Sequence, residues 1–275
     1  MTWLGAAAPV AAAGTKVTTL GGARVEYADE GRGRTLLFFN GFGMDLHQWD
    51  GQAALLARQY RVVRFNPRGW GRSSAPASRV SPVEDAVALL DALHVDRVVA
   101  VGASVGGADA LELAVSHPDR VTAMVLAGPT PEAYAWTDAY EHRLAGFTVA
   151  TRGERVQRML SDPYYVPAAQ RDPALASRVR RNIGDNAKAF ASRAALARAA
   201  GPPPFERLAS IRAPTLVIVG SLEHPEVVRA ADRIVEGLPA ARRATLDGVG
   251  QMGHVERPDG FTLLVRIFLR DARLF

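Results

Sequence analysis

The sequence of 275 residues contains no cysteine. Disulfides, thiolate nucleophiles and cysteine-ligated metal clusters are therefore excluded. Lysine is scarce as well, because all but two of the 33 basic residues are arginine. The net charge of +5 is distributed along the chain between acidic residues, and no basic stripe is interleaved with aromatic residues. We therefore expect no nucleic-acid partner.

Long apolar runs are missing too. No segment reaches the roughly 20 apolar residues that span a bilayer. Residues 1–14 lack the positively charged start that is typical of a secretory signal. These features predict a cytoplasmic protein without membrane contact. A hydrophobic content of 48% over this length suits one large domain, or one domain with an insertion.

Several short apolar runs show no alternation between apolar and polar residues, which is typical of strands buried on both faces. They cover residues 36–39, 62–65, 98–101, 123–126 and 216–219. Two extended runs come first, at 16–20 and 23–28, and Gly21-Gly22 joins them as a hairpin turn. Helical segments separate the apolar runs, and Ser81-Pro82-Val83-Glu84 carries a full helix-start signal. The sequence predicts an α/β fold with a doubly wound, mostly parallel sheet and an N-terminal antiparallel hairpin.

The strand pattern stops at residue 131 and resumes after residue 207. The intervening sequence is helical in character, rich in arginine and aromatic residues, and interrupted by prolines. We interpret residues 131–207 as an inserted helical cap. Residues 1–130 and 208–275 then form the core domain.

The segment around Ser104 is the strongest functional signal. The apolar run 98–101 leads through Gly102-Ala103 into Ser104, and Val105-Gly106-Gly107 opens a helix expected to end at Ser116. Small neighbours permit the sharp strand-to-helix bend that exposes a serine hydroxyl at a helix N-terminus, where negative charge is stabilised. The pattern favours Ser104 as a nucleophile. A purely structural glycine and serine turn is the alternative.

A serine hydroxyl needs a base, and the base needs an acid to orient it. Of the six histidines, His254 follows the last expected strand, residues 243–246, in the loop Gly250-Gln251-Met252-Gly253-His254, and we predict that it is the base. Glu223 lies three residues after Gly220, where another expected strand ends, and we predict that it is the acid. A glutamate before a proline-led helix also complements the helix dipole, which is the alternative for Glu223.

A negatively charged oxygen that forms during attack on a carbonyl needs two backbone donors. The N–H of Val105 is the first candidate. The second is the N–H of Phe42 in Asn40-Gly41-Phe42-Gly43, where glycines permit close approach of a substrate. These glycines could equally serve the turn alone.

Together these motifs resemble the α/β-hydrolase superfamily. The resemblance is carried by Asn40-Gly41-Phe42-Gly43 with Trp49, Asn66-Pro67-Arg68-Gly69-Trp70-Gly71-Arg72-Ser73, the bend at Ser104, His117-Pro118-Asp119-Arg120-Val121, and Gly253-His254 ahead of Glu256-Arg257-Pro258. In style the motifs are similar to 3-oxoadipate enol-lactonases and to related esterases, C–C hydrolases and perhydrolases. The resemblance implies attack by serine on a small ester, lactone or thioester, an acyl-enzyme resolved by water, and neither cofactor nor metal.

Two positions depart from the family pattern. Asn66 stands where the family usually has aspartate, and Glu223 stands where most members have aspartate. These departures leave a second hypothesis open, namely a non-hydrolytic protein of the same fold. Such a protein would be a cyclase-like or lyase-like biosynthetic enzyme, or a small-molecule binding protein, that uses the same pocket and oxyanion hole.

The cap is expected to select the substrate. Four aromatic residues and one arginine are candidates to line a cavity above Ser104: Tyr134, Trp136, Tyr140, Tyr165 and Arg143. Arg143 could orient a substrate carboxylate through paired hydrogen bonds. Ordinary packing within the cap is the alternative for each of them. The expected partner is a small-molecule substrate, and homo-oligomerisation is left open.

Overall fold

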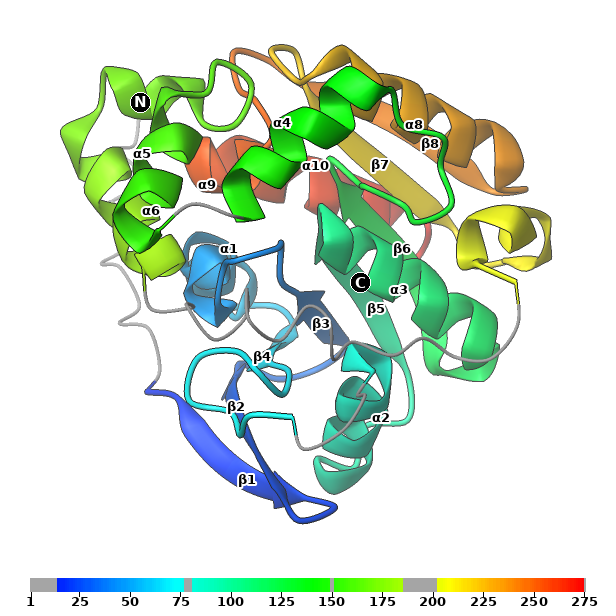
Figure 1. Ribbon diagram of the computed structural model, residues 1–275. Coiled ribbons are helices and arrows are strands. Elements are labelled where there is room, and N and C mark those ends of the chain that lie inside the picture. The colour runs from blue at the N-terminus through cyan, green and yellow to red at the C-terminus, as the bar shows by residue number, and fades with distance from the viewer. Residues whose placement is uncertain (1–13, 77–80, 149–150, 185–201, 275) are drawn as a thin grey trace, which may run out of the picture.

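The computed structural model describes residues 14–76, 81–148, 151–184 and 202–274. Its centre is an eight-stranded sheet in the order β1-β2-β4-β3-β5-β6-β7-β8 (Figure 1). The strands are β1 (Lys16–Leu20), β2 (Ala23–Glu30), β3 (Thr35–Phe39), β4 (Arg61–Asn66), β5 (Val98–Ala103), β6 (Val121–Ala127), β7 (Thr215–Gly220) and β8 (Ala241–Leu246). β1 and β2 pair antiparallel, as do β2 and β4, and all other pairs are parallel. The predicted fold class is confirmed.

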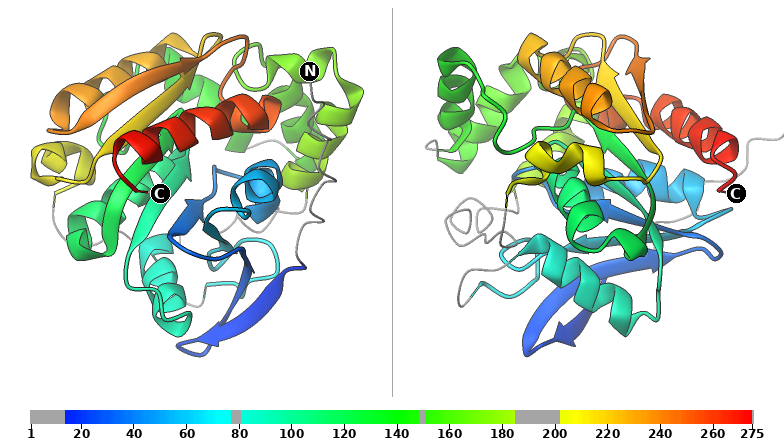
Figure 2. Two further views of the ribbon diagram at one scale, coloured as in Figure 1. Left: turned by 180° about the vertical axis from the view of Figure 1, so that it is seen from behind. Right: turned by 90° about the vertical axis from the view of Figure 1, so that its right-hand side faces the viewer.

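Helices cover both faces of the sheet (Figure 2). One face carries α2 (Pro82–Ala92), α3 (Val105–Ser116) and α8 (Pro225–Gly237). The other carries α1 (Asp50–Leu56) and α10 (Pro258–Asp271). Alternate residues of each strand face the two layers: Leu37 packs toward the first layer, and Leu36 and Phe38 pack toward the second. Because both faces are buried, the central strands are apolar throughout, as the sequence pattern predicts.

The helix-start signal at Ser81 operates as expected. The Ser81 side chain accepts hydrogen bonds from the N–H groups of Val83 and Glu84, and Pro82 is the first helical residue. The predicted helix 105–116 matches α3 residue for residue. Two short elements between β3 and β4 were not predicted: α1 and the 3-10 helix η1 (Leu46–Trp49).

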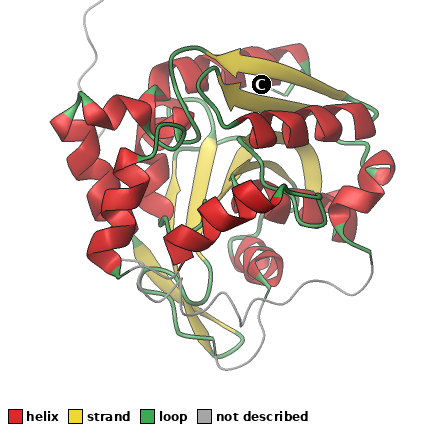
Figure 3. Cartoon of the chain, turned by 45° about the horizontal axis from the view of Figure 1, so that its top comes forward, coloured by secondary structure: helices red, strands yellow, loops and turns green. Residues whose placement is uncertain are grey.

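Between β6 and β7 the chain forms α4 (Asp138–Thr148), α5 (Arg152–Ser161), η3 (Pro167–Gln170), α6 (Pro173–Gly184) and η5 (Pro204–Ser210). The remaining short elements are η2 (Pro118–Arg120) and α9 (Gly253–Glu256). The helices α4, α5 and α6 lie beyond the ends of the parallel strands (Figures 1 and 3). Their apolar side chains pack on three core residues: Met44, Met252 and Val255. The cap boundaries at 131 and 207 stay a prediction.

No described helix combines the length and the apolar character needed to cross a bilayer.

Candidate active site

Ser104 occupies a strained bend between β5 and α3. Its backbone has φ 52° and ψ −119°, a conformation that costs a residue with a side chain about 1–3 kcal/mol. The bend brings neighbouring backbone so close that a Cβ on Gly102 would collide with the carbonyl of Gly106. Only glycine fits there. The Ser104 Oγ lies 3.2 Å from the Oγ1 of Thr130, its hydrogen-bond partner.

Ser104 opens into a pocket of about 70 Å³ between the core and the cap. The core contributes Phe42, Val105 and Thr130, and α4 contributes Tyr140 and Arg143. The remaining lining residues are mostly apolar: Gly41, Ala103, Leu144, Phe147, Met159, Tyr165, Gln251 and Met252. The structure thus places Ser104 in one pocket with both residues proposed for the oxyanion hole and with three of the five cap residues named from the sequence.

Tyr134 and Trp136 are not among the lining residues of this pocket. Their rings lie 4.5 Å apart edge to face, and Trp136 stacks on Tyr140 at 4.7 Å. They form an aromatic row with Tyr140, which continues to the ring of His224 at 4.8 Å. Their contact with a substrate stays a prediction.

Arg143 has a partner within the cap. Its guanidinium donates two hydrogen bonds of 2.7 Å to the carboxylate of Asp162, and it lies within 6 Å of the ring centres of Tyr140, Phe147 and Tyr164. The pairing with Asp162 compensates the charge of Arg143 before any substrate arrives. The proposed contact with a substrate carboxylate stays a prediction.

His254 lies at the start of α9, behind the pocket wall, and is only 1% exposed. Its ring packs on Trp49 with a centroid distance of 4.4 Å. Its Nε2 lies 3.2 Å from the Oε1 of Gln48, and its Nδ1 has no hydrogen-bond partner. Among the hydrogen bonds of the described residues, none joins His254 to Ser104 or to Glu223.

Gln48 determines which nitrogen of His254 carries the proton. The Gln48 Oε1 accepts the N–H of Gly41 at 3.3 Å, and its Nε2 donates to the carbonyl of Asp45 at 3.2 Å. These partners fix the orientation of the amide, so Oε1 is an acceptor for His254 and the imidazole Nε2 must be the donor. Burial lowers the pKa of His254 to about 3, so the ring is neutral. In this arrangement the Nε2 cannot accept a proton.

Glu223 follows β7 and is 6% exposed. Its Oε1 accepts the N–H of His224 at 2.9 Å, whereas its Oε2 is buried without a partner. Burial raises the pKa of Glu223 to about 8, so the carboxyl group is mostly protonated at neutral pH. The carboxyl group and His254 line the same small enclosed space of about 10 Å³.

Gln251 is a site residue that the sequence analysis did not single out. Its Nε2 donates to the carbonyl of Gly128 at 2.7 Å. Among the described residues it alone lines both the Ser104 pocket and the enclosed space beside Glu223 and His254. The loop contains two glycine-led pairs, Gly250-Gln251 and Gly253-His254. Sequence analysis selected His254 as the histidine in the loop after the last expected strand, whereas Gln251 of the first pair is the residue that lines the Ser104 pocket.

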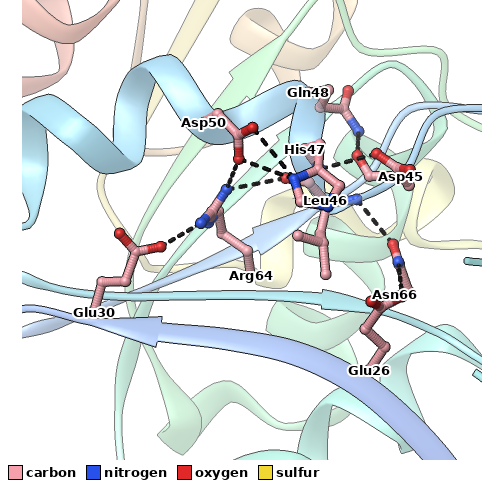
Figure 4. Close-up of polar contacts among 9 residues, drawn as sticks. All are labelled: Glu26, Glu30, Asp45, Leu46, His47, Gln48, Asp50, Arg64 and Asn66. Carbon is pink, nitrogen blue, oxygen red and sulfur yellow. Dashed lines mark hydrogen bonds and ion pairs between the residues drawn. The ribbon is translucent and has the colours of Figure 1, made fainter. Parts of the chain in front are cut away.

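A buried polar network supports the loop after β3 (Figure 4). The Asn66 Oδ1 accepts hydrogen bonds from the Asn40 side chain and the Leu46 N–H, at 3.0 and 2.8 Å. The Asn66 Nδ2 donates to the buried carboxylate of Glu26 at 2.9 Å. An aspartate at position 66 would place a second carboxylate against Glu26. Asn66, which departs from the family pattern, thus lies against the buried carboxylate of Glu26 and can donate to it.

The same network continues on the other side of the loop, where the fully buried Arg64 pairs with the carboxylates of Glu30 and Asp50 (Figure 4). Asp50 also contacts His47, and this hydrogen bond raises the pKa of the imidazole. Asp45 caps η1 by accepting the N–H of His47 at 2.9 Å. These contacts hold the loop that carries Gly41 and Phe42 in place.

Comparisons with known proteins agree with this architecture. A family model described as the alpha/beta hydrolase fold matches residues 34–258. The chain is 27% identical to 3-oxoadipate enol-lactonase 1 of Acinetobacter baylyi, over 86% of this chain and 89% of that protein. It is 27% identical to the 2-hydroxy-6-oxononadienedioate/2-hydroxy-6-oxononatrienedioate hydrolase of Paraburkholderia xenovorans, over 90% of this chain and 91% of that protein.

A solved structure with similar architecture is that of Est816, described as an N-acyl homoserine lactone degrading enzyme. It has a TM-score of 0.76 and 27% identity, over 92% of this chain and 100% of that one. All three relatives are named for the breakdown of small carbonyl compounds, and the matched family model spans most of the sequence. The chain belongs to the α/β-hydrolase fold family, a family of hydrolases.

Proposed function

We propose that this protein is a serine hydrolase that acts on the carbonyl carbon of a small ester, lactone or thioester. The observation that carries the proposal is the backbone of Ser104. A residue with a side chain is held at φ 52° at the N-terminus of α3, inside a pocket closed by the cap. Strain of this kind persists where the surrounding structure enforces it, and it holds the hydroxyl at a fixed place.

The reaction has two steps. The Ser104 Oγ forms a bond to the carbonyl carbon, the bond to the leaving oxygen or sulfur breaks, and the serine proton leaves with the alcohol or thiol. Water then hydrolyses the acyl-enzyme, so that the carboxylic acid is released and the proton returns to Ser104. The N–H groups of Val105 and Phe42 are our candidates to stabilise the tetrahedral oxyanion, each by roughly 3 kcal/mol.

The pocket favours a compact, largely apolar acyl group. A volume of about 70 Å³ and a lining that includes Leu144, Phe147 and Met159 suit a short chain or a small ring. The named substrates of the enol-lactonase and of Est816 are lactones. Lactones and short-chain esters are therefore the first compounds to assay.

The test compares wild-type protein with Ser104→Ala. We expect Ser104→Ala to abolish both turnover of a panel of short-chain esters, lactones and thioesters and labelling by a fluorophosphonate probe. Ser116→Ala is the matched control, because Ser116 is an exposed serine at the other end of α3. Unchanged hydrolysis by purified Ser104→Ala would refute the proposal.

A second candidate is supported by the position of His254. With its Nε2 engaged by Gln48 and its Nδ1 unpaired, this histidine does not assist Ser104 in the described arrangement. A pocket with an oxyanion hole but without a base fits non-hydrolytic chemistry, such as a cyclisation or the binding of a carbonyl compound. Tight ligand binding by a wild-type protein that resists the fluorophosphonate probe would favour this candidate.

A further inference from the structure

Gln251 is, among the described residues, the one that lies between the pocket of Ser104 and the space beside Glu223. It lines the pocket on the serine side and the enclosed space on the glutamate side. The Gln251 Nε2 and the Glu223 Oε2 lie 2.8 and 2.9 Å from the point at which a Cβ on Gly128 would stand. The ends of the two side chains therefore both lie against Gly128, where φ is 48° and no side chain stands between them, although no hydrogen bond joins them.

The unpaired oxygen of Glu223 marks this point as a place for a hydrogen-bond partner. The Glu223 Oε2 is buried without a partner, although buried polar atoms are normally hydrogen-bonded. A ring N–H at position 251 would meet this oxygen from one side while the opposite ring nitrogen faced the serine pocket. That relation between acid, base and nucleophile is the one that activates a serine.

His254 is held away from Ser104 by the way the loop is anchored. The N–H groups of Gln251 and Met252 donate to the carbonyls of Tyr164 and Tyr165, at 2.8 and 2.9 Å. A Cβ on Gly250 would collide with the Tyr164 carbonyl, so the loop lies directly against the cap. The His254 carbonyl is held in turn by the Gln52 side chain at 2.6 Å. Bringing His254 to Ser104 would require these contacts to be broken together.

We propose that Gln251, and not His254, occupies the position between Glu223 and Ser104 from which a general base would act. This inference rests on the proposed function only in taking Ser104 as the group that meets the carbonyl. A carboxamide cannot accept the serine proton, so Gln251 is a positioning residue that fixes the pocket wall by its bond to Gly128. The pocket then favours substrates that are activated by strain or by a good leaving group, because little help comes from proton removal.

The test installs the missing base. General-base catalysis contributes about 10²- to 10⁴-fold, so we expect Gln251→His to raise kcat/KM for activated esters and the rate of fluorophosphonate labelling by about tenfold or more. The gain should depend on pH, with an inflection where the new imidazole titrates. Gln157→His, which places a histidine on the exposed face of α5, is the matched control.

Two double variants identify the partners of the new base. Glu223→Gln in the Gln251→His background should remove most of the gain. His254→Gln in the same background should retain it, since glutamine keeps an N–H donor for Gln48.

A folded Gln251→His protein without any gain would overturn the inference, as would loss of the gain with His254→Gln alone. The proposed function fails separately, by undiminished hydrolysis in Ser104→Ala.

A smaller side chain gives an independent test that does not require a histidine to fit. In Gln251→Ala, imidazole added to the buffer can enter the vacated space and act as the base. We expect hydrolysis by this variant to rise with imidazole concentration and to saturate, beyond the increase that wild-type protein shows. Equal responses of the two proteins to imidazole would contradict the assignment.

Discussion

Replacing Glu223 by glutamine removes a buried carboxyl group whose pKa is raised by burial from 4.5 to about 8. A raised pKa means that the folded protein binds this proton more tightly than the unfolded chain does. The contribution to stability is therefore fully present below pH 4.5 and is lost as the pH rises toward 8. Glutamine has nearly the same shape and does not titrate, so Glu223→Gln does not lose stability in this way.

The magnitude follows from the pH interval. Each pH unit between the unfolded and folded pKa values is worth about 1.4 kcal/mol per proton. Between pH 5 and pH 8 the free energy of unfolding of Glu223→Gln should therefore gain up to about 4 kcal/mol relative to wild type. His254 contributes the opposite slope below pH 6.5, because its folded pKa is lowered to about 3, but it does so in both proteins and cancels in the difference.

The assay is urea unfolding of both proteins at pH 5, 6.5 and 8, at constant ionic strength. Glu141→Gln is the control, because Glu141 is an exposed glutamate on α4. We expect the control to follow the wild-type pH dependence and Glu223→Gln to depart from it steadily as the pH rises. Parallel curves for wild type and Glu223→Gln would show that the buried carboxyl group is ionised at an ordinary pH, and the argument would fail.

Three further substitutions test the packing of the site. Ser104→Gly should increase the free energy of unfolding by about 1 kcal/mol, because glycine adopts φ 52° without strain, and it should eliminate probe labelling. Lower stability in urea would contradict the strain argument. In Asn66→Asp the free energy of unfolding should fall by about 3 kcal/mol at neutral pH and recover in part at pH 5, because the new carboxylate faces the buried Glu26. Equal stability at both pH values would be inconsistent with that repulsion. Arg143→Met should lower the thermal midpoint, because it leaves Asp162 as an unpaired, mostly buried charge at a cost of about 3 kcal/mol. An unchanged midpoint would argue for a solvated carboxylate.

The architecture could be predicted because the sequence signals are local and consistent. Continuous apolar runs, the glycine pair at 21–22 and the capping serine at 81 each determine one element, and the alternation of strands with helices predicts a parallel sheet with right-handed crossovers. The bend at Ser104 could also be predicted from the sequence, because only small residues fit beside it. The helices α1 and η1 were missed because they have only 7 and 4 residues, too few to show a helical repeat of apolar positions, although Asp45 caps η1.

The relation between acid, base and nucleophile could not be predicted in the same way. The sequence places Gln251 and His254 three residues apart in one loop, and side-chain chemistry alone favours the imidazole. The hydrogen bonds of Gln251 and Met252 to the cap decide which of them faces the pocket, and such long-range contacts leave no trace in a local pattern. Gln48 was missed for the same reason, because its partner His254 is 206 residues away along the chain.

Glu256 links the cap to the loop that follows β8. One carboxylate oxygen accepts the N–H of Ala168 at 2.9 Å, and the other accepts the N–H of Gly250 at 2.8 Å. The first residue belongs to the insertion and the second directly precedes Gln251. A displacement of η3 away from the core would therefore also displace the backbone that carries Gln251. Opening the cap for a large substrate and positioning the pocket wall beside Ser104 are thus coupled through the Glu256 carboxylate.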